Sequence, residues 1–134
     1  MEYPVLPELT PLNRAWFTSG TLAVQHCPDC DVLQHPPEEL CHRCGRMNLD
    51  TKELAPTGTV YSHTIVHYAA SPRLYDSVPY TVVLVALDDA PDIRVVGDLL
   101  GEPHDVMVGM PVVAEWSEHE VDGEVIRLPH WRKA

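Results

Sequence analysis

Apolar and polar residues alternate in short segments along the second half of the chain, as they do in β-strands with one buried face. The alternation is clearest in GTVYSHTIVHY at residues 58–68. Residues 80–87, YTVVLVAL, are so apolar that we expect a central strand buried on both faces. Asp122 and Gly123 form a dipeptide favoured in tight hairpins. The five strands predicted here are residues 58–68, 80–87, 93–100, 112–118 and 125–131.

The first half of the chain predicts a different organisation, with one helix and two short strands. Thr10 can cap a helix of about two turns that contains Trp16 and ends at Gly20. A helix this short is marginal alone, so its aromatic residues must pack on the protein or on a partner. Residues 1–9 hold two prolines and are expected to form an extended arm. Residues 22–25 and 32–34 are predicted strands, residues 48–56 a polar linker and residues 69–79 a long loop.

All four cysteines lie in two Cys-x-x-Cys pairs separated by ten residues. A tetrahedral thiolate site needs two such pairs, because each turn lets both sulfurs face one ion while backbone amides point at them. We therefore predict a structural Zn²⁺ site whose ligands are Cys27, Cys30, Cys41 and Cys44. Zinc affinities of about 10 to 16 kcal/mol are comparable to or larger than the stability of a whole domain, so the ion would act in folding.

Other uses of these cysteines are a disulfide, a redox dithiol and an iron site. No signal peptide starts the chain, so we expect a cytoplasmic protein with reduced thiols. A redox dithiol uses one Cys-x-x-Cys, usually in a thioredoxin-like unit, and no such unit follows. Iron stays an alternative because rubredoxin has the same ligand set. His26, His35 and His42 lie nearby, but four thiolates fill the shell, so we predict that these histidines are not ligands.

Composition and charge narrow the class of protein. The chain has 134 residues, of which 45% are hydrophobic and 22% charged, which is typical of a soluble globular protein with its own core. Nine basic against twenty acidic residues give a net charge of -11, which repels phosphate backbones and argues against a nucleic-acid module. No apolar run approaches the roughly 20 residues that cross a membrane. We expect no nucleic-acid or membrane partner.

These elements predict a mainly β protein. Its parts are an N-terminal arm and short helix at residues 1–21, a rubredoxin-like zinc ribbon at residues 22–50 and a five-stranded OB-fold barrel at residues 51–134. A five-stranded sandwich would show the same periodicity, so the pattern alone leaves both architectures open.

The sequence contains few candidate catalytic residues. A nucleophile would be a serine, lysine or cysteine beside a base, but the cysteines are assigned to the metal and Gly-x-Ser-x-Gly is absent. His63 and His67 share one face of the first barrel strand with Tyr61 and are the best candidates for acid or base chemistry. Histidines at this spacing are more often exposed or packed. We predict no catalytic residue in this chain.

The order and spacing of these motifs resemble the thirty-fifth domain-of-unknown-function family. The matching motifs are Leu22 before the cysteines, H-P-P at residues 35–37, Gly45 after the last cysteine, G-T-V-Y-S at residues 58–62, V-P-Y at residues 78–80 and V-G-M-P-V at residues 108–112. The resemblance covers nearly the whole chain and implies a zinc ribbon joined to an OB fold. The C-terminal residues depart from the family pattern, because Lys133 follows Arg132 where proline is usual.

The resemblance implies that this chain binds a partner enzyme, and gives little indication of a reaction of its own. Members resemble obligate subunits of thiolase-superfamily enzymes, including acetoacetyl-CoA thiolase assemblies and the lipid-transfer-protein-like aldolases that shorten steroid side chains as CoA thioesters. We therefore expect a non-catalytic accessory subunit that binds and stabilises such an enzyme in a hetero-oligomer, with acyl-CoA near the interface. The steroid-type aldolase (a lyase of lipid metabolism) is preferred over a short-chain thiolase by family association alone. The alternatives are a stand-alone acyl-CoA carrier and, less favoured because of the net charge, a nucleic-acid-binding module of zinc ribbon and OB fold.

A CoA-binding surface would need cations for the phosphates. Arg43, Arg46 and Arg73 are the weak candidates for this role, because positive charges are scarce around the ribbon and the long loop. Ordinary surface solvation is the alternative explanation for each.

Overall fold

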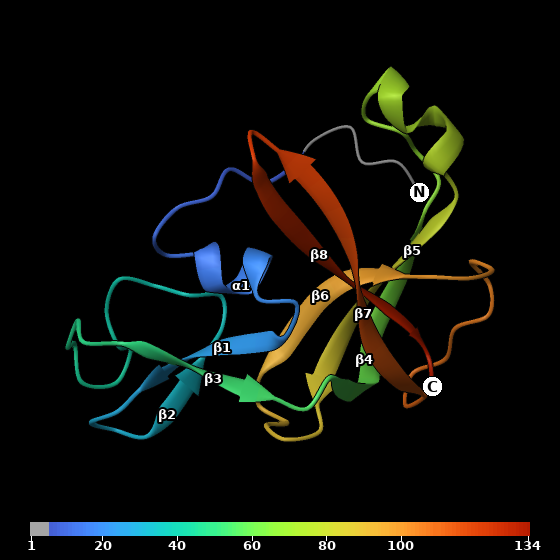
Figure 1. Cartoon of the computed structure of the whole chain (residues 1–134). Coiled ribbons are helices and arrows are strands. Elements are labelled where there is room, and N and C mark those ends of the chain that lie inside the picture. Colours follow the sequence, from blue (N-terminus) through green and yellow to red (C-terminus); the bar gives the residue numbers. More distant parts are fainter. Residues whose placement is uncertain (1–5) are drawn as a thin grey trace.

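The computed structural model describes residues 6–134, without the side chains of Arg73 and Leu74, and shows two β-sheets and little helix (Figure 1). Residues 1–5 of the expected extended arm lie outside the described part. The elements in chain order are α1 (Arg14–Thr18), β1 (Leu22–Cys27), β2 (Val32–Gln34), β3 (Asp50–Leu54), β4 (Thr57–Val66), the 3-10 helix η1 (Pro72–Ser77), β5 (Tyr80–Leu87), β6 (Arg94–Leu99), β7 (Pro111–Val121) and β8 (Glu124–Lys133).

The five C-terminal strands form a closed barrel in the order β4-β5-β6-β8-β7. Neighbouring strands are antiparallel except β6 and β8, which are parallel and share one paired position, Leu99 with Trp131. This arrangement is the closed OB-type barrel and excludes the sandwich. Asp122 and Gly123 both have positive φ, at 52° and 82°, as the tight β7–β8 hairpin requires. The predicted mainly β fold with an N-terminal cysteine cluster is confirmed.

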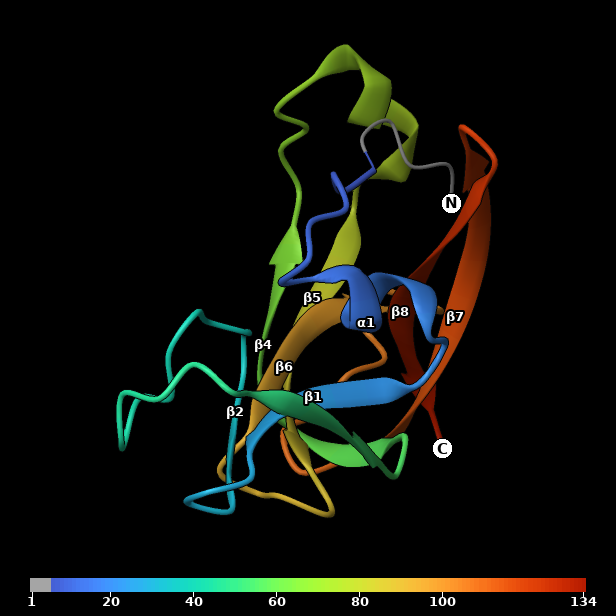
Figure 2. The ribbon, with the colours of Figure 1, turned by 60° about the vertical axis from the view of Figure 1, so that its left-hand side comes forward.

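The smaller sheet has the order β2-β1-β3 and lies against one end of the barrel (Figures 1 and 2). Its third strand, β3, pairs along its whole length with β1, from Leu54 opposite Leu22 to Asp50 opposite His26. The prediction of a polar linker at residues 48–56 is therefore wrong. The segment is an edge strand held by backbone pairing, and four of its five side chains are exposed, so it carries no hydrophobic alternation.

Strand β5 is buried on one face only, which corrects the prediction that both faces are buried. The side chains of Thr81, Val83, Val85 and Leu87 point into the barrel and are buried, whereas the alternate side chains are half-buried on the outer face. In a closed barrel each strand turns just one face to the core. The expected long loop at residues 69–79 contains the 3-10 helix η1, which stands apart from the ribbon in both views (Figures 1 and 2).

Helix α1 is shorter than predicted. Thr10 caps the turn that leads into the helix: its hydroxyl accepts a hydrogen bond from the Asn13 amide at 3.2 Å, and the Asn13 side chain accepts one from the Thr10 amide at 2.8 Å. The α-helix itself has five residues. Arg127 of β8 donates a hydrogen bond to the carbonyl of Thr18 at 2.6 Å, which fixes the end of the helix on the barrel. No helix within residues 6–134 is long and apolar enough to cross a membrane.

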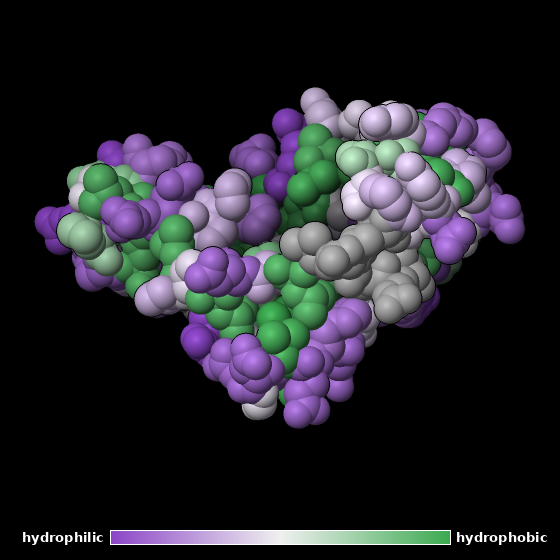
Figure 3. Space-filling model, turned by 90° about the horizontal axis from the view of Figure 1, so that it is seen from above, coloured by the Kyte–Doolittle hydropathy of each residue, from purple (hydrophilic) through white to green (hydrophobic). Residues whose placement is uncertain are grey.

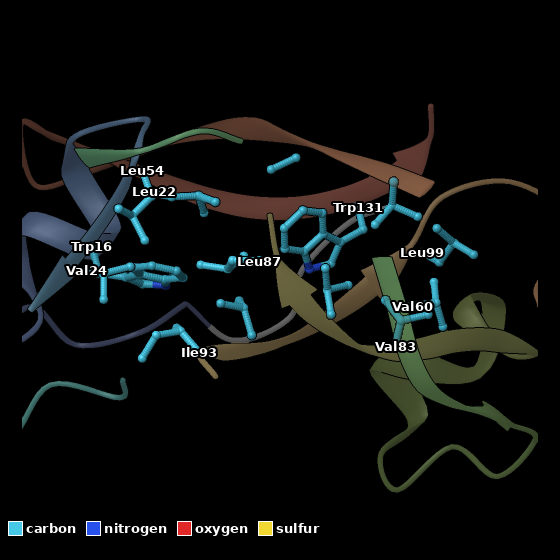
Figure 4. Close-up of a cluster of buried hydrophobic side chains, with 14 residues drawn as sticks. Trp16, Leu22, Val24, Leu54, Val60, Val83, Leu87, Ile93, Leu99 and Trp131 are labelled. Carbon is cyan, nitrogen blue, oxygen red and sulfur yellow. The ribbon is translucent and has the colours of Figure 1, made fainter. Parts of the chain in front are cut away.

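A single hydrophobic cluster joins the ribbon to the barrel (Figure 4). Trp16 of α1 lies with Leu22, Val24 and Leu54 of the small sheet at one end of the cluster, and Leu87 and Ile93 connect this end to the barrel core around Trp131. Trp16 is 9% exposed, so it satisfies the expectation that the helix packs on the body of the protein. The positions of α1, ribbon and barrel are therefore mutually fixed.

Replacing Trp16 by alanine is expected to lower the free energy of unfolding by about 3 to 5 kcal/mol, because it opens a cavity where the ribbon and the barrel meet. Leu12→Ala is the matched control, since Leu12 belongs to the same segment but is exposed, and it should cost less than about 1 kcal/mol. Urea unfolding followed by circular dichroism measures both. Equal losses for the two variants would contradict the shared core.

Candidate functional site

The four cysteine sulfurs all lie within 4.8 Å of one another, at the end of the small sheet. The first pair follows from β1, whose last residue is Cys27, and the second lies in the turn before β3. The sulfurs of Cys27 and Cys44 are 3.7 Å apart. Four sulfurs around a tetrahedral ion with metal–sulfur bonds of about 2.3 Å are about 3.8 Å apart. The cluster therefore fits a zinc-sized ion.

The two cysteine turns have the same backbone geometry. The amide of Asp31 donates to the carbonyl of Cys27 at 2.8 Å, and the amide of Gly45 donates to the carbonyl of Cys41 at 2.9 Å. The residue after the second cysteine has positive φ in both turns, 55° at Asp31 and 73° at Gly45. Aspartate is among the few non-glycine residues that accept this conformation readily. The repeated turn places each pair of sulfurs on one side of the backbone.

Charge in the cluster favours a cation. Backbone amides of Cys44 and Arg43 donate to the Cys41 sulfur and lower the pKa of that thiol to about 6. Hydrogen bonding with the Cys44 side chain, and then burial, raises the pKa of Cys30 to about 12. Four thiolates this close repel one another unless an ion neutralises them, since the thiolate is the metal-binding form. The four cysteines are positioned to bind a metal ion.

Each histidine near the cluster has contacts of its own. His26 lies between Asp31 and Asp50, with ring nitrogens 2.7 Å and 2.8 Å from their carboxylates, and these hydrogen bonds raise its pKa. His42 contacts the Gln34 side chain at 2.6 Å. Within residues 6–134 the group of possible metal ligands contains the four cysteines alone. The structure thus gives His26 and His42 other partners, while the assignment of individual ligands stays a prediction.

Two buried glutamines hold the segment between the cysteine pairs. Gln25 of β1 accepts hydrogen bonds from the Gln34 side chain at 2.7 Å and from the Glu38 amide at 2.9 Å, and donates to the Glu38 carbonyl at 2.7 Å. Gln34 donates to the Leu40 carbonyl at 3.0 Å and accepts from the His42 amide at 3.0 Å. We call these bonds the glutamine clamp. Sequence reasoning missed it, although the two residues are direct partners across the predicted strand pair.

The three arginine candidates do not gather in one place. Arg43 is exposed beside the second cysteine pair, and Arg46 in the same turn pairs with Asp29 at 3.1 Å. Arg73 belongs to η1, away from the ribbon in Figures 1 and 2, and its side chain is outside the described structure. Their proposed role toward CoA stays a prediction.

The histidines proposed for acid or base chemistry are on the surface. His63 and His67 are exposed, and Tyr61 beside them is covered by the guanidinium of Arg94, 3.9 Å from the ring centre. His63 lies in β4, whereas His67 follows the last residue of that strand.

A hydrogen-bonded series that the sequence did not predict crosses three barrel strands. Asp98 of β6 contacts His130 of β8 at 2.7 Å, and the other ring nitrogen of His130 lies 2.7 Å from the hydroxyl of Ser117 in β7. His119 contacts the same hydroxyl at 2.8 Å. Carboxylate, imidazole and hydroxyl have the order of an acyl-transfer triad, but Ser117 is held by two imidazoles inside a paired hairpin. We interpret these hydrogen bonds as structural: they help to close the barrel between β6 and β8, which share only one paired backbone position.

One part of this series, the contact between Ser117 and His130, could have been predicted from the sequence. A tight hairpin at Asp122 and Gly123 places Glu115 opposite His130 and Ser117 opposite Leu128, so Ser117 and His130 are diagonal neighbours on one face. Asp98 joins them only through the parallel contact of β6 and β8. That contact depends on the barrel order and leaves no local signal.

Replacing Cys41 by serine is expected to remove the bound zinc and lower the melting temperature, because a serine hydroxyl replaces one thiolate of the closed shell. Plasma mass spectrometry of the purified protein should give about one zinc per chain for the wild type, and it also distinguishes zinc from iron. His42→Ala is the control and should retain its metal. An unchanged zinc content in Cys41→Ser would refute the structural site.

The contribution of His35 to stability should fall as the pH drops below the usual histidine pKa of 6.5. Burial against Trp16, with ring centres 4.4 Å apart, lowers the pKa of His35. The unfolded chain then binds more protons than the folded one, so this contribution is complete above pH 6.5 and is lost toward the lower folded pKa. His35→Phe should flatten the slope of melting temperature between pH 7.5 and 5.5. A slope equal to that of the wild type would contradict this assignment.

Two family models match the chain. The one described as "ChsH2, rubredoxin-like zinc ribbon domain" matches residues 18–50, and the one described as "ChsH2, C-terminal OB-fold domain" matches residues 51–117. The expected boundaries at residues 21/22 and 50/51 remain predictions, and β3 runs across the second of them. The match confirms the resemblance to a zinc ribbon joined to an OB fold.

Three known proteins are also similar to this chain. A "Probable enoyl-CoA hydratase alpha subunit" of Thermomonospora curvata is 36% identical over 96% of this chain, which spans 39% of the length of that relative. A "DUF35 domain-containing scaffold protein" of Methanocaldococcus jannaschii is 29% identical over 73% of this chain and 69% of its own length. A solved chain described as "Ltp2-ChsH2(DUF35) aldolase" superposes with a TM-score of 0.79 at 37% identity, covering 96% of this chain and 98% of that one. The chain therefore belongs to the ChsH2 (DUF35) family of zinc-ribbon and OB-fold proteins.

Proposed function

We propose that this chain is a non-catalytic accessory subunit that binds and stabilises a thiolase-superfamily enzyme acting on acyl-CoA thioesters. The observation that carries the proposal is the likeness, over 98% of its length, to a chain of an assembly whose description joins Ltp2 to a ChsH2 protein as an aldolase. The other two relatives are described as an alpha subunit and as a scaffold protein. All three descriptions are those of proteins that act together with another chain.

The surface supports a role in binding a partner. Large apolar side chains are exposed at separate places, among them Met47 beside the second cysteine pair, 72% exposed, and Met107 and Val108 before β7, 69% and 63% exposed. Figure 3 shows apolar surface on the lobe at the left of the view, which belongs to the ribbon, and on the lower middle of the molecule. Methionine and aromatic residues are enriched at protein interfaces. Exposed side chains of this kind favour a surface that a partner protein covers in the complex.

The metal has a structural part in this proposal. Cys27, Cys30, Cys41 and Cys44 would hold Zn²⁺ in a closed shell, where the ion supplies four bonds that fix the two turns and no open position for a reaction. The ribbon then presents exposed side chains such as Leu40 and Met47 in a fixed orientation. Chemistry would take place on the partner chain, with the acyl-CoA near the interface.

The proposal also names the class of partner enzyme and its substrate. We place the partner among aldolases that cleave carbon–carbon bonds in acyl-CoA thioesters, with steroid side chains as the preferred acyl group and short-chain thiolysis as the second choice. The description of the solved relative as an aldolase, and that of the Thermomonospora curvata relative as an enoyl-CoA hydratase subunit, support enzymes that act on thioesters.

The test is co-expression with a thiolase-like protein from the same organism. We expect a stable complex in size-exclusion chromatography, and acyl-CoA cleavage by the complex that falls at least tenfold when this subunit is left out. The isolated subunit should be inactive and should show no acyl-CoA binding by calorimetry, whereas binding would support the stand-alone carrier. Separate elution of the two chains, with a partner fully active alone, would refute the proposal.

A further inference from the structure

A cavity of about 490 Å³ lies where α1, the segment at residues 35–37 and strands β6 and β8 meet. We call it the helix cavity. Its mouth includes Leu12 and Val96, which are 41% and 63% exposed, so the cavity opens to the surface. Its inner residues include His35, Asp98 and His130.

Two residues that line the helix cavity each have a buried polar atom without a hydrogen-bond partner. These atoms are Nδ1 of His35 and Oδ2 of Asp98, both buried. These are the buried side-chain atoms of the described residues that lack a partner. A buried carboxylate oxygen without a donor is destabilising, because it has lost its hydrogen bonds to water and gained none in return. Two such atoms on residues that line one cavity indicate an occupant that donates hydrogen bonds.

The barrel holds the Asp98 carboxylate in a fixed orientation. Its Oδ1 is engaged by His130 at 2.7 Å, and His130 is held in turn by Ser117. The side chain of His130 is 6% exposed and that of Asp98 17%. The carboxylate therefore cannot turn both oxygens to the helix cavity, and it offers Oδ2 alone to an occupant.

The remaining wall of the helix cavity is apolar and aromatic. Trp16 and Phe17 of α1 line one side, and Leu128 and Pro129 of β8 the other. An acyl chain would suit these walls but would leave Oδ2 of Asp98 without a donor. A guanidinium group donates five hydrogen bonds, stacks on aromatic rings and is more weakly hydrated than an ammonium group. It also carries the charge that complements a carboxylate in a protein of net charge -11.

We propose that the helix cavity receives an arginine side chain of the partner enzyme, whose guanidinium donates hydrogen bonds to Oδ2 of Asp98 and Nδ1 of His35 while its methylene groups lie against α1 and β8. The inference rests on the proposed function, since it names the contact through which the partner is held. Neutral His35, which burial favours, has an acceptor nitrogen for this purpose. Arginine in a desolvated pocket is typical of the residues that dominate binding energy.

The first test is the affinity of the complex with Asp98→Asn. Asparagine keeps an oxygen for His130 but removes the charge and places an amide donor toward the occupant. The dissociation constant, measured by calorimetry, should rise about 30-fold or more, as expected for one partner of a buried hydrogen-bonded charge pair. Glu102→Gln is the matched control, because it removes one exposed charge outside the helix cavity, and its affinity should change less than threefold.

A second variant guards against a folding defect in Asp98→Asn. Val96→Lys places an ammonium group on the same strand face two residues from Asp98, where it can occupy Oδ2 and exclude the partner's arginine. Val96→Met keeps the rim apolar and serves as its control. We expect Val96→Lys to weaken binding at least tenfold at an unchanged melting temperature, and Val96→Met to bind like the wild type.

The partner's residue is identified by replacing the arginines of the partner with glutamine, one at a time, in a double-mutant cycle with Asp98→Asn. One replacement should weaken the wild-type complex and have little further effect on the Asp98→Asn complex. Wild-type affinity in both Asp98→Asn and Val96→Lys, or additive effects for every arginine, would overturn this inference and leave the proposed function standing. Failure of the wild-type chain to form any complex would overturn both.

Discussion

The packing of Trp16 between the small sheet and the barrel is the interaction on which the rest of the structure depends. The ribbon alone has three short strands and few buried side chains, so it could not bury a core of its own. Leu22 and Val24 reach the same cluster as Ile93 and Leu87, which turns two small units into one folding unit. The cysteine turns, the glutamine clamp and the helix cavity all keep their places because this cluster fixes α1 and β1.

Local signals in the sequence predicted most of this fold. The cysteine spacing, the Asp122–Gly123 turn and the alternation of strands such as β4 depend on neighbouring residues and were correctly interpreted. Strand β3 was missed because an edge strand is held by backbone hydrogen bonds and its exposed side chains show no pattern. The outer face of β5 was assigned to the core because apolar composition cannot distinguish a half-covered barrel strand from one between two layers.

The candidate sites also differ in whether local sequence signals could predict them. The cysteine cluster follows from spacing alone, since each pair closes its own turn and the chain has no other thiols. The series from Asp98 to Ser117 and the helix cavity could not be predicted, because they combine α1, the segment after β2 and three barrel strands. His35 shows the difference. Its position before two prolines was visible in the sequence, but its contact with Trp16, 19 residues earlier, depends on the tertiary structure.

The glutamine clamp also bears on how the metal is bound. Its hydrogen bonds join only protein groups, so the chain itself brings the second cysteine pair toward the first. The order that the metal site requires therefore comes partly from two side chains that do not bind the ion. Substitution of either glutamine would leave more of the loop to be ordered by the metal itself, and would so weaken metal binding.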